Sequence, residues 1–92
     1  MELEWDAEKA TRNLKKHGVS FEDAKRVFFN PWRIESYDER EDYGEDRWTT
    51  IGQVGAVLLF VVYTLRRGEV VRLISARRAN AYEKKQYREA NT

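Results

Sequence analysis

Two arginines stand at the ends of segments that have the apolar pattern of β-strands. Arg77 ends the segment 69–77, and Arg47 begins the segment 47–54. The guanidinium group of arginine keeps its charge at neutral pH, and its planar fork matches two oxygens of a phosphate. Because strands joined by short turns pair antiparallel, the sheet could bring both arginines to one groove. The pattern therefore indicates a site that binds a phosphate and stabilises negative charge developing on it.

Further charged residues are candidates for the same site. Glu45 lies two residues before Arg47 and is the candidate general base, if the strand begins early enough to place both side chains on one face. Arg66 and Arg78 are expected to contact a nucleic-acid backbone. If the strand continues through both residues, alternation directs Arg78 to the face opposite Arg77, so at most one of these two neighbours lines the groove.

Surface ion pairs are the alternative interpretation of the two arginines. Arg77 and Arg47 could each pair with a nearby carboxylate, namely Glu45, Asp46 or Glu83. An exposed pair of this kind contributes only ~0–1 kcal/mol to stability.

Polar residues of the first expected helix, 7–17, offer weaker candidates. Lys16 is a candidate contact to RNA, although it and Asn13 fit a solvated helix face equally well. His17 belongs to the residue type most used for acid–base chemistry. Its place at the end of the helix favours a capping role instead, because a cation there interacts with the helix dipole.

The composition limits the kind of site that the chain can build. Its 92 residues suit a single domain over residues 1–92 with a modest core, to which 12 aromatic residues contribute much of the area. There is no cysteine, which excludes disulfides and thiolate metal sites, and one histidine, which argues against a histidine-based metal site. We therefore expect neither a metal nor a cofactor.

The net charge of +1 conceals a segregation along the chain. The segment 35–47 carries seven acidic and two basic residues, whereas the segment 66–78 carries five arginines and one glutamate. A basic segment of this kind is typical of nucleic-acid binding, while the near-neutral total argues against indiscriminate binding to long polyanions.

No signal peptide is recognisable, and the longest apolar run, 56–65, is about half the ~20 residues of a membrane-spanning helix. We expect a cytoplasmic protein without membrane contact.

Two helices are expected before the strands that carry the arginines. A short edge strand at 3–5 precedes the helix 7–17, for which Asp6 is the N-cap. A second helix begins after the N-cap Ser20 and stops at Asn30-Pro31, because the residue before a proline avoids the helical conformation. The expected buried positions of the two helices are Ala7, Ala10, Leu14, Phe21, Ala24, Val27 and Phe28.

The second half of the chain has the period of β-strands. Four strands are expected, at 32–37, 47–54, 56–66 and 69–77, and the third is apolar on both faces as in a central strand. The acidic segment 38–46 between the first two is expected to be a solvated, mobile loop.

A C-terminal helix is expected after the N-cap Asn80. Its Tyr82, Gln86 and Tyr87 are expected to pack back on the sheet, although the two tyrosines could instead stack on a base. The whole order predicts an α+β fold: a short strand, two helices, a four-stranded antiparallel meander and a C-terminal helix.

Several short motifs occur in the order and spacing of a known family. They are W-D-x-x-K-x-x-x-N-x-x-K-H-G at 5–18, V-S-F-E-D-A-x-x-V-F at 19–28, N-P at 30–31, E-D-R-W-x-x-I-G at 45–52, V-V-Y-T-x-R at 61–66 and I-S-A-R-R-A at 74–79, followed by Glu83 and Tyr87. Over nearly its whole length, the chain resembles the BrnT toxins of bacterial type II toxin–antitoxin systems.

The resemblance implies a specific function. It implies a fold similar to that of the RelE ribonucleases and cleavage of RNA without a metal. It also implies neutralisation by a BrnA-type antitoxin, whose ribbon-helix-helix domain binds DNA and represses the shared operon. It favours Arg77 and Arg47 as catalytic residues, whereas Glu45 as the base, and Arg66, Arg78 and Lys16 as RNA contacts, are expected from the residues themselves.

Two other interpretations remain open. The same arginines could hold an antitoxin or nucleic acid in a non-catalytic module that acts as a corepressor of the operon. The chain could also be a protein–protein adaptor, in which lysine would replace Arg47 and Arg77 without consequence.

Overall fold

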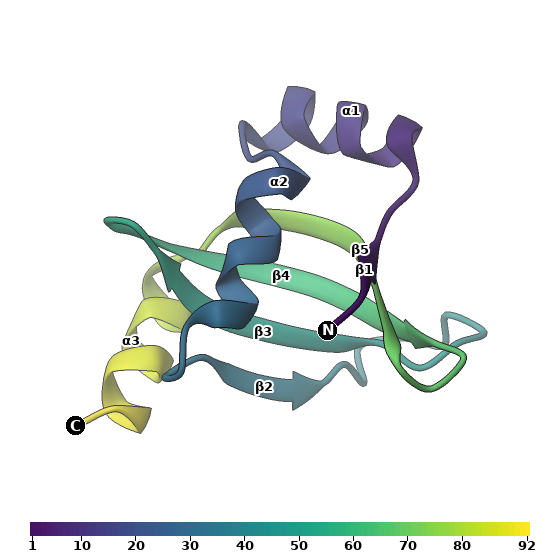
Figure 1. The fold of residues 1–92 in the computed structure, drawn as a ribbon. Coiled ribbons are helices and arrows are strands. Elements are labelled where there is room, and N and C mark those ends of the chain that lie inside the picture. The colour runs from purple at the N-terminus through teal and green to yellow at the C-terminus, as the bar shows by residue number, and fades with distance from the viewer.

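In the computed structural model, which describes residues 1–92, a five-stranded sheet separates two layers of helix (Figure 1). The first layer holds α1 and α2, and α3 lies against the other face. The elements in chain order are β1 (Leu3–Glu4), α1 (Ala7–His17), α2 (Phe21–Ala24), the 3₁₀ helix η1 (Lys25–Phe29), β2 (Ile34–Tyr37), β3 (Trp48–Val54), β4 (Val57–Arg66), β5 (Val70–Arg78) and α3 (Ala81–Ala90). The predicted α+β order is confirmed.

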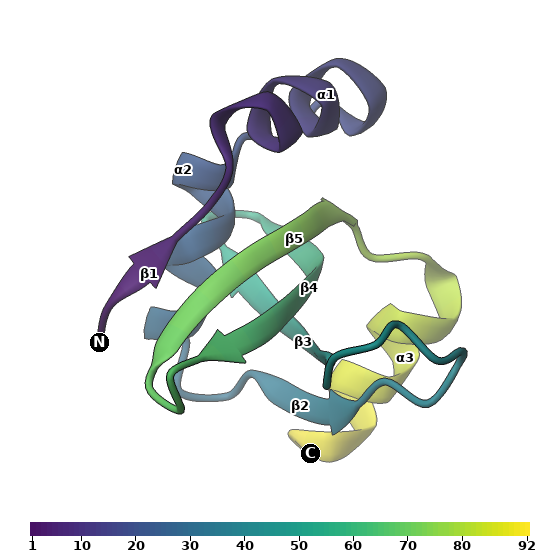
Figure 2. The ribbon, with the colours of Figure 1, turned by 90° about the vertical axis from the view of Figure 1, so that its right-hand side faces the viewer.

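The sheet has the strand order β1-β5-β4-β3-β2. The strands β2 to β5 form the expected antiparallel meander, and β1 adds a short parallel strand along β5 (Figure 2). A register shift at Val62 and Tyr63 marks an irregularity where β4 pairs with β5.

Apolar residues of β4 are buried on both faces of the sheet, as predicted for a central strand. One face packs under α1, α2 and η1, and the smaller cluster on the other face packs under α3. The first cluster contains Val19, Phe21, Ala24, Val27, Phe28, Val54, Leu59, Val61, Tyr63, Val71, Leu73 and Ala76. The second contains Ile51, Phe60, Val62, Ala79 and Tyr87.

Local sequence signals fix the ends of the two N-terminal helices. The Asp6 carboxylate accepts a hydrogen bond from the Lys9 amide at the start of α1, and Gly18 ends this helix with φ of 70°. Only glycine adopts this left-handed conformation without strain. Ser20 caps α2 in the same way as Asp6, and the helix tightens into η1 before Asn30 ends it.

The buried face of α1 differs from the prediction. Leu14 is 50% exposed and Ala7 is exposed, whereas Asn13, expected on a solvated face, is 6% exposed. The Asn13 amide donates to the carbonyls of Ala76 (2.8 Å) and Val19 (2.9 Å), and its oxygen accepts from the Ala76 N–H (3.0 Å). The prediction was wrong because β5 extends beyond the two residues of β1, and the Asn13 side chain pairs with the free edge there.

The buried face of α3 also differs in part from the prediction. Glu83 and Tyr87 are buried, but Tyr82 and Gln86 are exposed. The Asn80 cap determines this rotation, because Glu83 returns a hydrogen bond to the Asn80 N–H in a capping box. Tyr87 lies four residues further along and therefore shares the buried face. None of the helices combines the length and the apolar character needed to cross a membrane.

Replacement of Asn13 is expected to lower the stability of the fold. Asn13→Ala leaves the backbone groups of Ala76 and the carbonyl of Val19 without partners, which costs about 2–4 kcal/mol in the free energy of unfolding. Urea denaturation measures this loss, with Lys9→Ala on the exposed side of the same helix as the control. Equal midpoints for the two variants would contradict the role given to Asn13.

Candidate active site

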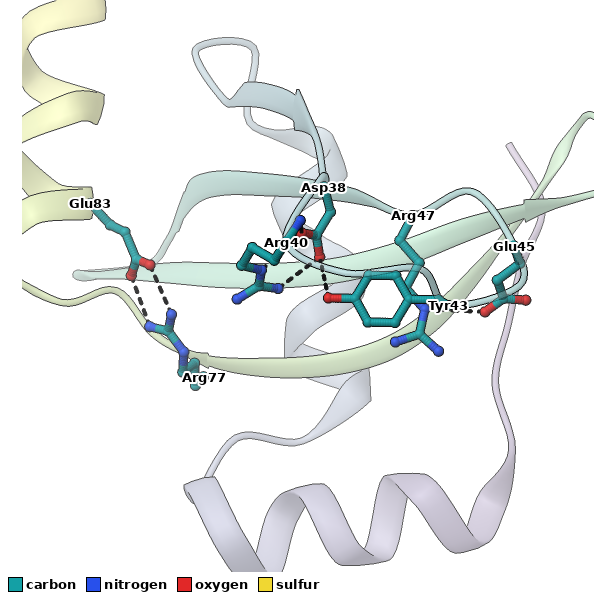
Figure 3. A network of polar contacts seen from close by, with 7 residues as sticks. All are labelled: Asp38, Arg40, Tyr43, Glu45, Arg47, Arg77 and Glu83. Carbon is teal, nitrogen blue, oxygen red and sulfur yellow. Dashed lines mark hydrogen bonds and ion pairs between the residues drawn. The ribbon is translucent and has the colours of Figure 1, made fainter.

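Three pairs of an arginine and a carboxylate lie along the sheet face opposite α1 and α2 (Figure 3). The end of β5 and the start of α3 contribute one ion pair of this network. The loop between β2 and β3 contributes the others. The residues of the network are Glu83, Arg77, Arg40, Asp38, Tyr43, Arg47 and Glu45.

Arg77 is held by a bidentate ion pair with Glu83. Both of its terminal nitrogens lie 2.8 Å from the Glu83 oxygens, and its guanidinium carbon lies 4.3 Å from the centre of the Phe60 ring. The ion pair with Glu83 that the alternative interpretation of Arg77 considered is therefore present. Arg77 is still 33% exposed, and its hydrogen bonds to Glu83 and to the Arg78 carbonyl leave part of its fork free for a ligand.

Glu83 connects the orientation of Arg77 to the first turn of α3. The same carboxylate that holds Arg77 accepts the hydrogen bond from the Asn80 N–H at 2.9 Å. Burial raises the pKa of Glu83, but the hydrogen bonds from Arg77 and Asn80 lower it more, so that the pKa lies below its ordinary value. Glu83 is thus a charged positioning residue for Arg77.

Arg40 is a member of the network that sequence reasoning missed. Its side chain bonds both oxygens of Asp38, at 2.8 and 2.7 Å, and its guanidinium carbon lies 5.8 Å from the centre of Phe60. Arg40 and Arg77 therefore share one aromatic ring. Its sequence signal is weak, because a single arginine in an acidic segment is typical of a solvated loop.

The loop 38–46 is ordered by a buried carboxylate rather than solvated throughout. Asp38 is 5% exposed and accepts hydrogen bonds from the side chains of Arg40 and Tyr43. The hydrogen bonds from Arg40 hold the pKa of Asp38 at about 2, below its ordinary value. The prediction of a solvated loop was wrong for Asp38, which follows β2 directly and points into the sheet face beside Arg40, whereas residues 39–42 and 44–46 are exposed as expected.

Arg47 lies at the other end of the network. Its guanidinium carbon is 4.0 Å from the centre of the Tyr43 ring, and its Nε lies 3.2 Å from a Glu45 oxygen. The strand β3 begins at Trp48, so Glu45 contacts Arg47 from the loop and not as a strand neighbour. The sequence argument required β3 to begin before Glu45, and this is wrong. The side chains of Glu45 and Arg47 nevertheless contact each other.

The three expected RNA contacts lie outside this network. Arg78 is exposed on the face opposite Arg77, beside Gly18 and Arg26, which confirms the alternation predicted for the strand end. Lys16 is exposed on α1, in the helical layer of that opposite face.

Arg66 lies at the far end of β4, six residues from Phe60, the β4 residue that pairs with Arg77. There it lines a surface hollow with Glu45 and Asp46. No group of three or more His, Cys, Asp or Glu side chains is arranged to hold a metal ion.

Comparison with known protein families places the chain in the ribonuclease toxin class. Residues 5–83 match the family described as the ribonuclease toxin BrnT of type II toxin–antitoxin systems, and the chain belongs to this family. The matched residues include Arg47, Arg77 and Glu83. The family resemblance stated from the motifs is thereby confirmed, as is the ribonuclease toxin function.

A solved structure supports the same assignment. The chain is similar to the crystal structure of the Brucella abortus ribonuclease toxin BrnT, with a TM-score of 0.66 and 27% sequence identity. The similarity covers 87% of this chain and 97% of the Brucella chain. No match is found among curated proteins.

Acid is expected to lower the stability of the folded protein, because it protonates the Asp38 carboxylate. Its pKa is lower in the folded protein than the ordinary value of 3.8, so the stability that it contributes is complete above about pH 4 and is lost towards pH 2. Asp38→Asn should remove at most about 2 kcal/mol at neutral pH and flatten the acid limb of the stability curve. Urea unfolding from pH 2 to 7 measures this, with exposed Glu41→Gln as the control; parallel curves for wild type and Asp38→Asn would contradict it.

Proposed function

We propose that this toxin cleaves RNA endonucleolytically and without a metal, on the sheet face that carries the arginine network. The single observation that carries the proposal is the line of fixed guanidinium groups there, each held by a carboxylate and two of them packed on Phe60. Cations fixed before the reaction stabilise charge on a phosphate without the cost of reorganisation. The proposed location of the protein is the cytoplasm, where it would encounter both RNA and an antitoxin.

The proposed reaction is attack by the neighbouring 2′-hydroxyl on the scissile phosphate. A base removes the proton of the 2′-hydroxyl, whose oxygen forms a bond to phosphorus. The bond to the 5′-oxygen breaks, and that oxygen leaves with a proton from an acid. The products are a 2′,3′-cyclic phosphate and a 5′-hydroxyl, so the atoms balance without water or an oxidant.

In this proposal Arg77 and Arg47 contact the RNA backbone from the two ends of the network, and Arg40 between them supports both (Figure 3). Arg47 uses one nitrogen for Glu45, which leaves the rest of its fork for phosphate oxygens. A phosphate bound there lies near the Glu45 carboxylate, which supports Glu45 as the general base. Arg66 lines the hollow beside Glu45 and is placed to contact the continuing backbone.

Removal of Arg77 or Arg47 is expected to abolish most of the activity. Arg77→Ala and Arg47→Ala should each lower the cleavage rate roughly 10²–10³-fold, because each removes a fixed cation that stabilises the RNA backbone at the cut. Arg77→Lys keeps the charge but loses the fork and should fall in between. The measurement is cleavage of a fluorescent RNA in EDTA, with circular dichroism as the check on folding.

Arg78→Ala is the matched control, because Arg78 adjoins Arg77 but faces the opposite side of the sheet, and this proposal gives it no contact with the RNA at the cut. It should keep nearly the wild-type rate. Equal rates for Arg77→Ala and Arg78→Ala would overturn the assignment of Arg77. A folded wild-type protein that cleaves only with added metal would refute the metal-free reaction.

Membership of a type II toxin–antitoxin family implies an antitoxin partner. We propose that this partner is a BrnA-like protein with a ribbon-helix-helix DNA-binding domain, through which the complex contacts operator DNA indirectly. The exposed carboxylates Glu39, Glu41 and Asp42 support a cationic partner, because they surround a surface hollow beside the network. Opposite charge would increase the rate of association.

Charge reversal tests this contact. Glu41→Lys with Asp42→Lys should weaken the complex with the antitoxin by about tenfold in calorimetry at low salt, and less at high salt. Lys84→Glu on α3 is the control. Unchanged affinity for the antitoxin would exclude this loop as the contact.

The corepressor interpretation is the second candidate, and one observation favours it: Arg77 and Arg47 are already paired with carboxylates. A gel-shift assay of the antitoxin on operator DNA, with and without toxin, separates the two. Enhanced DNA binding together with inactive wild-type toxin would favour the corepressor, whereas cleavage that Arg77→Ala abolishes favours the ribonuclease.

A further inference from the structure

A cleft of about 490 Å³ opens between α3 and the strands β2 and β3. Phe60 and Ile51 form its apolar floor, and both belong to the core cluster under α3. Arg40 and Glu83 stand at its border, so the cleft adjoins the ion pair that holds Arg77. A group in the cleft would therefore lie next to a phosphate bound by Arg77.

The other side chains of the cleft are polar but mostly uncharged. Ser36 and Thr49 come from the strands, and Gln86 comes from α3. None of these three side chains takes part in a hydrogen bond within the protein. Their donors and acceptors are therefore available to a ligand.

Tyr82 stands over the cleft as an exposed aromatic ring. It is 69% exposed, and its hydroxyl group has no hydrogen-bond partner in the protein. The capping box of α3 explains this position, because it turns Glu83 towards the sheet and leaves the neighbouring Tyr82 on the exposed side of the helix. A large exposed ring beside free polar groups offers both a stacking surface and an edge for recognition.

The chemistry of the cleft fits a nucleobase better than a phosphate. Three carboxylates, of Asp38, Glu39 and Glu83, line the cleft against the single cation of Arg40, so the cleft disfavours an anion. A base is neutral, has apolar faces and carries donors and acceptors along its edge. Unpaired bases of RNA are commonly recognised by stacking on an aromatic ring together with hydrogen bonds to the edge.

We propose that this cleft binds one unpaired base next to the phosphate held by Arg77, with Tyr82 as the stacking surface and Ser36, Thr49 and Gln86 as contacts to the base edge. The inference rests on the proposed ribonuclease function and adds a substrate class to it. A base inside a duplex is stacked and paired and cannot enter the cleft. The substrate is therefore single-stranded RNA, and the cleft is where the sequence next to the cut is read.

The experiment measures binding separately from cleavage. A fluorescent 2′-O-methyl pentanucleotide cannot react, because its 2′-oxygens are blocked, and an abasic version of it keeps the same phosphates. Wild type should bind the pentanucleotide roughly tenfold or more tightly than the abasic version, as expected for the stacking of a base on an aromatic ring. Tyr82→Ala should lose most of this difference, and Tyr82→Phe should keep it.

Phe29→Ala is the matched control, because Phe29 is an equally exposed aromatic residue at the end of η1, outside the cleft. It should bind both probes as wild type does. Equal affinity of wild type for the two probes would overturn the proposal, as would a full base preference in Tyr82→Ala. Loss of antitoxin binding in Tyr82→Ala, with its base preference intact, would identify a protein as the occupant and would also overturn it.

Cleavage of the all-ribose pentanucleotide, measured in parallel, distinguishes failure of this proposal from failure of the ribonuclease proposal. Cleavage without any base-dependent binding removes the cleft and leaves the ribonuclease in place. Base-dependent binding that needs Tyr82, without cleavage, keeps the cleft and removes the proposed reaction.

Discussion

The carboxamide of Asn13 forms the contact on which the arrangement of the N-terminal half depends. It pairs with both backbone groups of Ala76 and with the carbonyl of Val19, and so joins α1, the connection between α1 and α2, and the edge of β5. The contact takes the place of the strand that β1, with two residues, is too short to provide. Ala76 immediately precedes Arg77, so the same contact helps fix the strand end that carries the first arginine of the site.

Side chains alternate in direction along β5, so the two arginines at its end lie on opposite faces of the sheet. Arg77 points to the face with Phe60 and Glu83, while Arg78 points to the face with α1 and α2. Glu83 then links the guanidinium group to the N-terminal turn of α3 through its capping box. Because Glu83 holds its guanidinium group, the Arg77 side chain loses its rotamer freedom during folding and not when a ligand binds. This is the physical basis for the preorganisation of the proposed phosphate site.

The acidic loop provides the counter-charges for the site. Asp38 and Glu45 hold Arg40 and Arg47, and Tyr43 lies between them, with its hydroxyl group on Asp38 and its ring under Arg47. The opposite charges that are segregated in the sequence therefore meet in the fold. The pairing limits the free positive charge on this face, which suits local recognition of a phosphate next to a base more than unspecific attachment to a long polyanion.

The sequence by itself determined the elements and the family, and it singled out the residues at the two ends of the arginine network. Helix caps, the strand period and the proline stop act over a few residues, so local patterns predict them, and Arg77, Arg47 and Glu45 stood out by charge and position. Only the tertiary structure decided that Asn13 and Asp38 are buried and that Arg40 joins the network. A polar side chain is buried only when its partners are in place. The Ala76 partner of Asn13 lies 63 residues away in the chain, a distance over which no local pattern carries information.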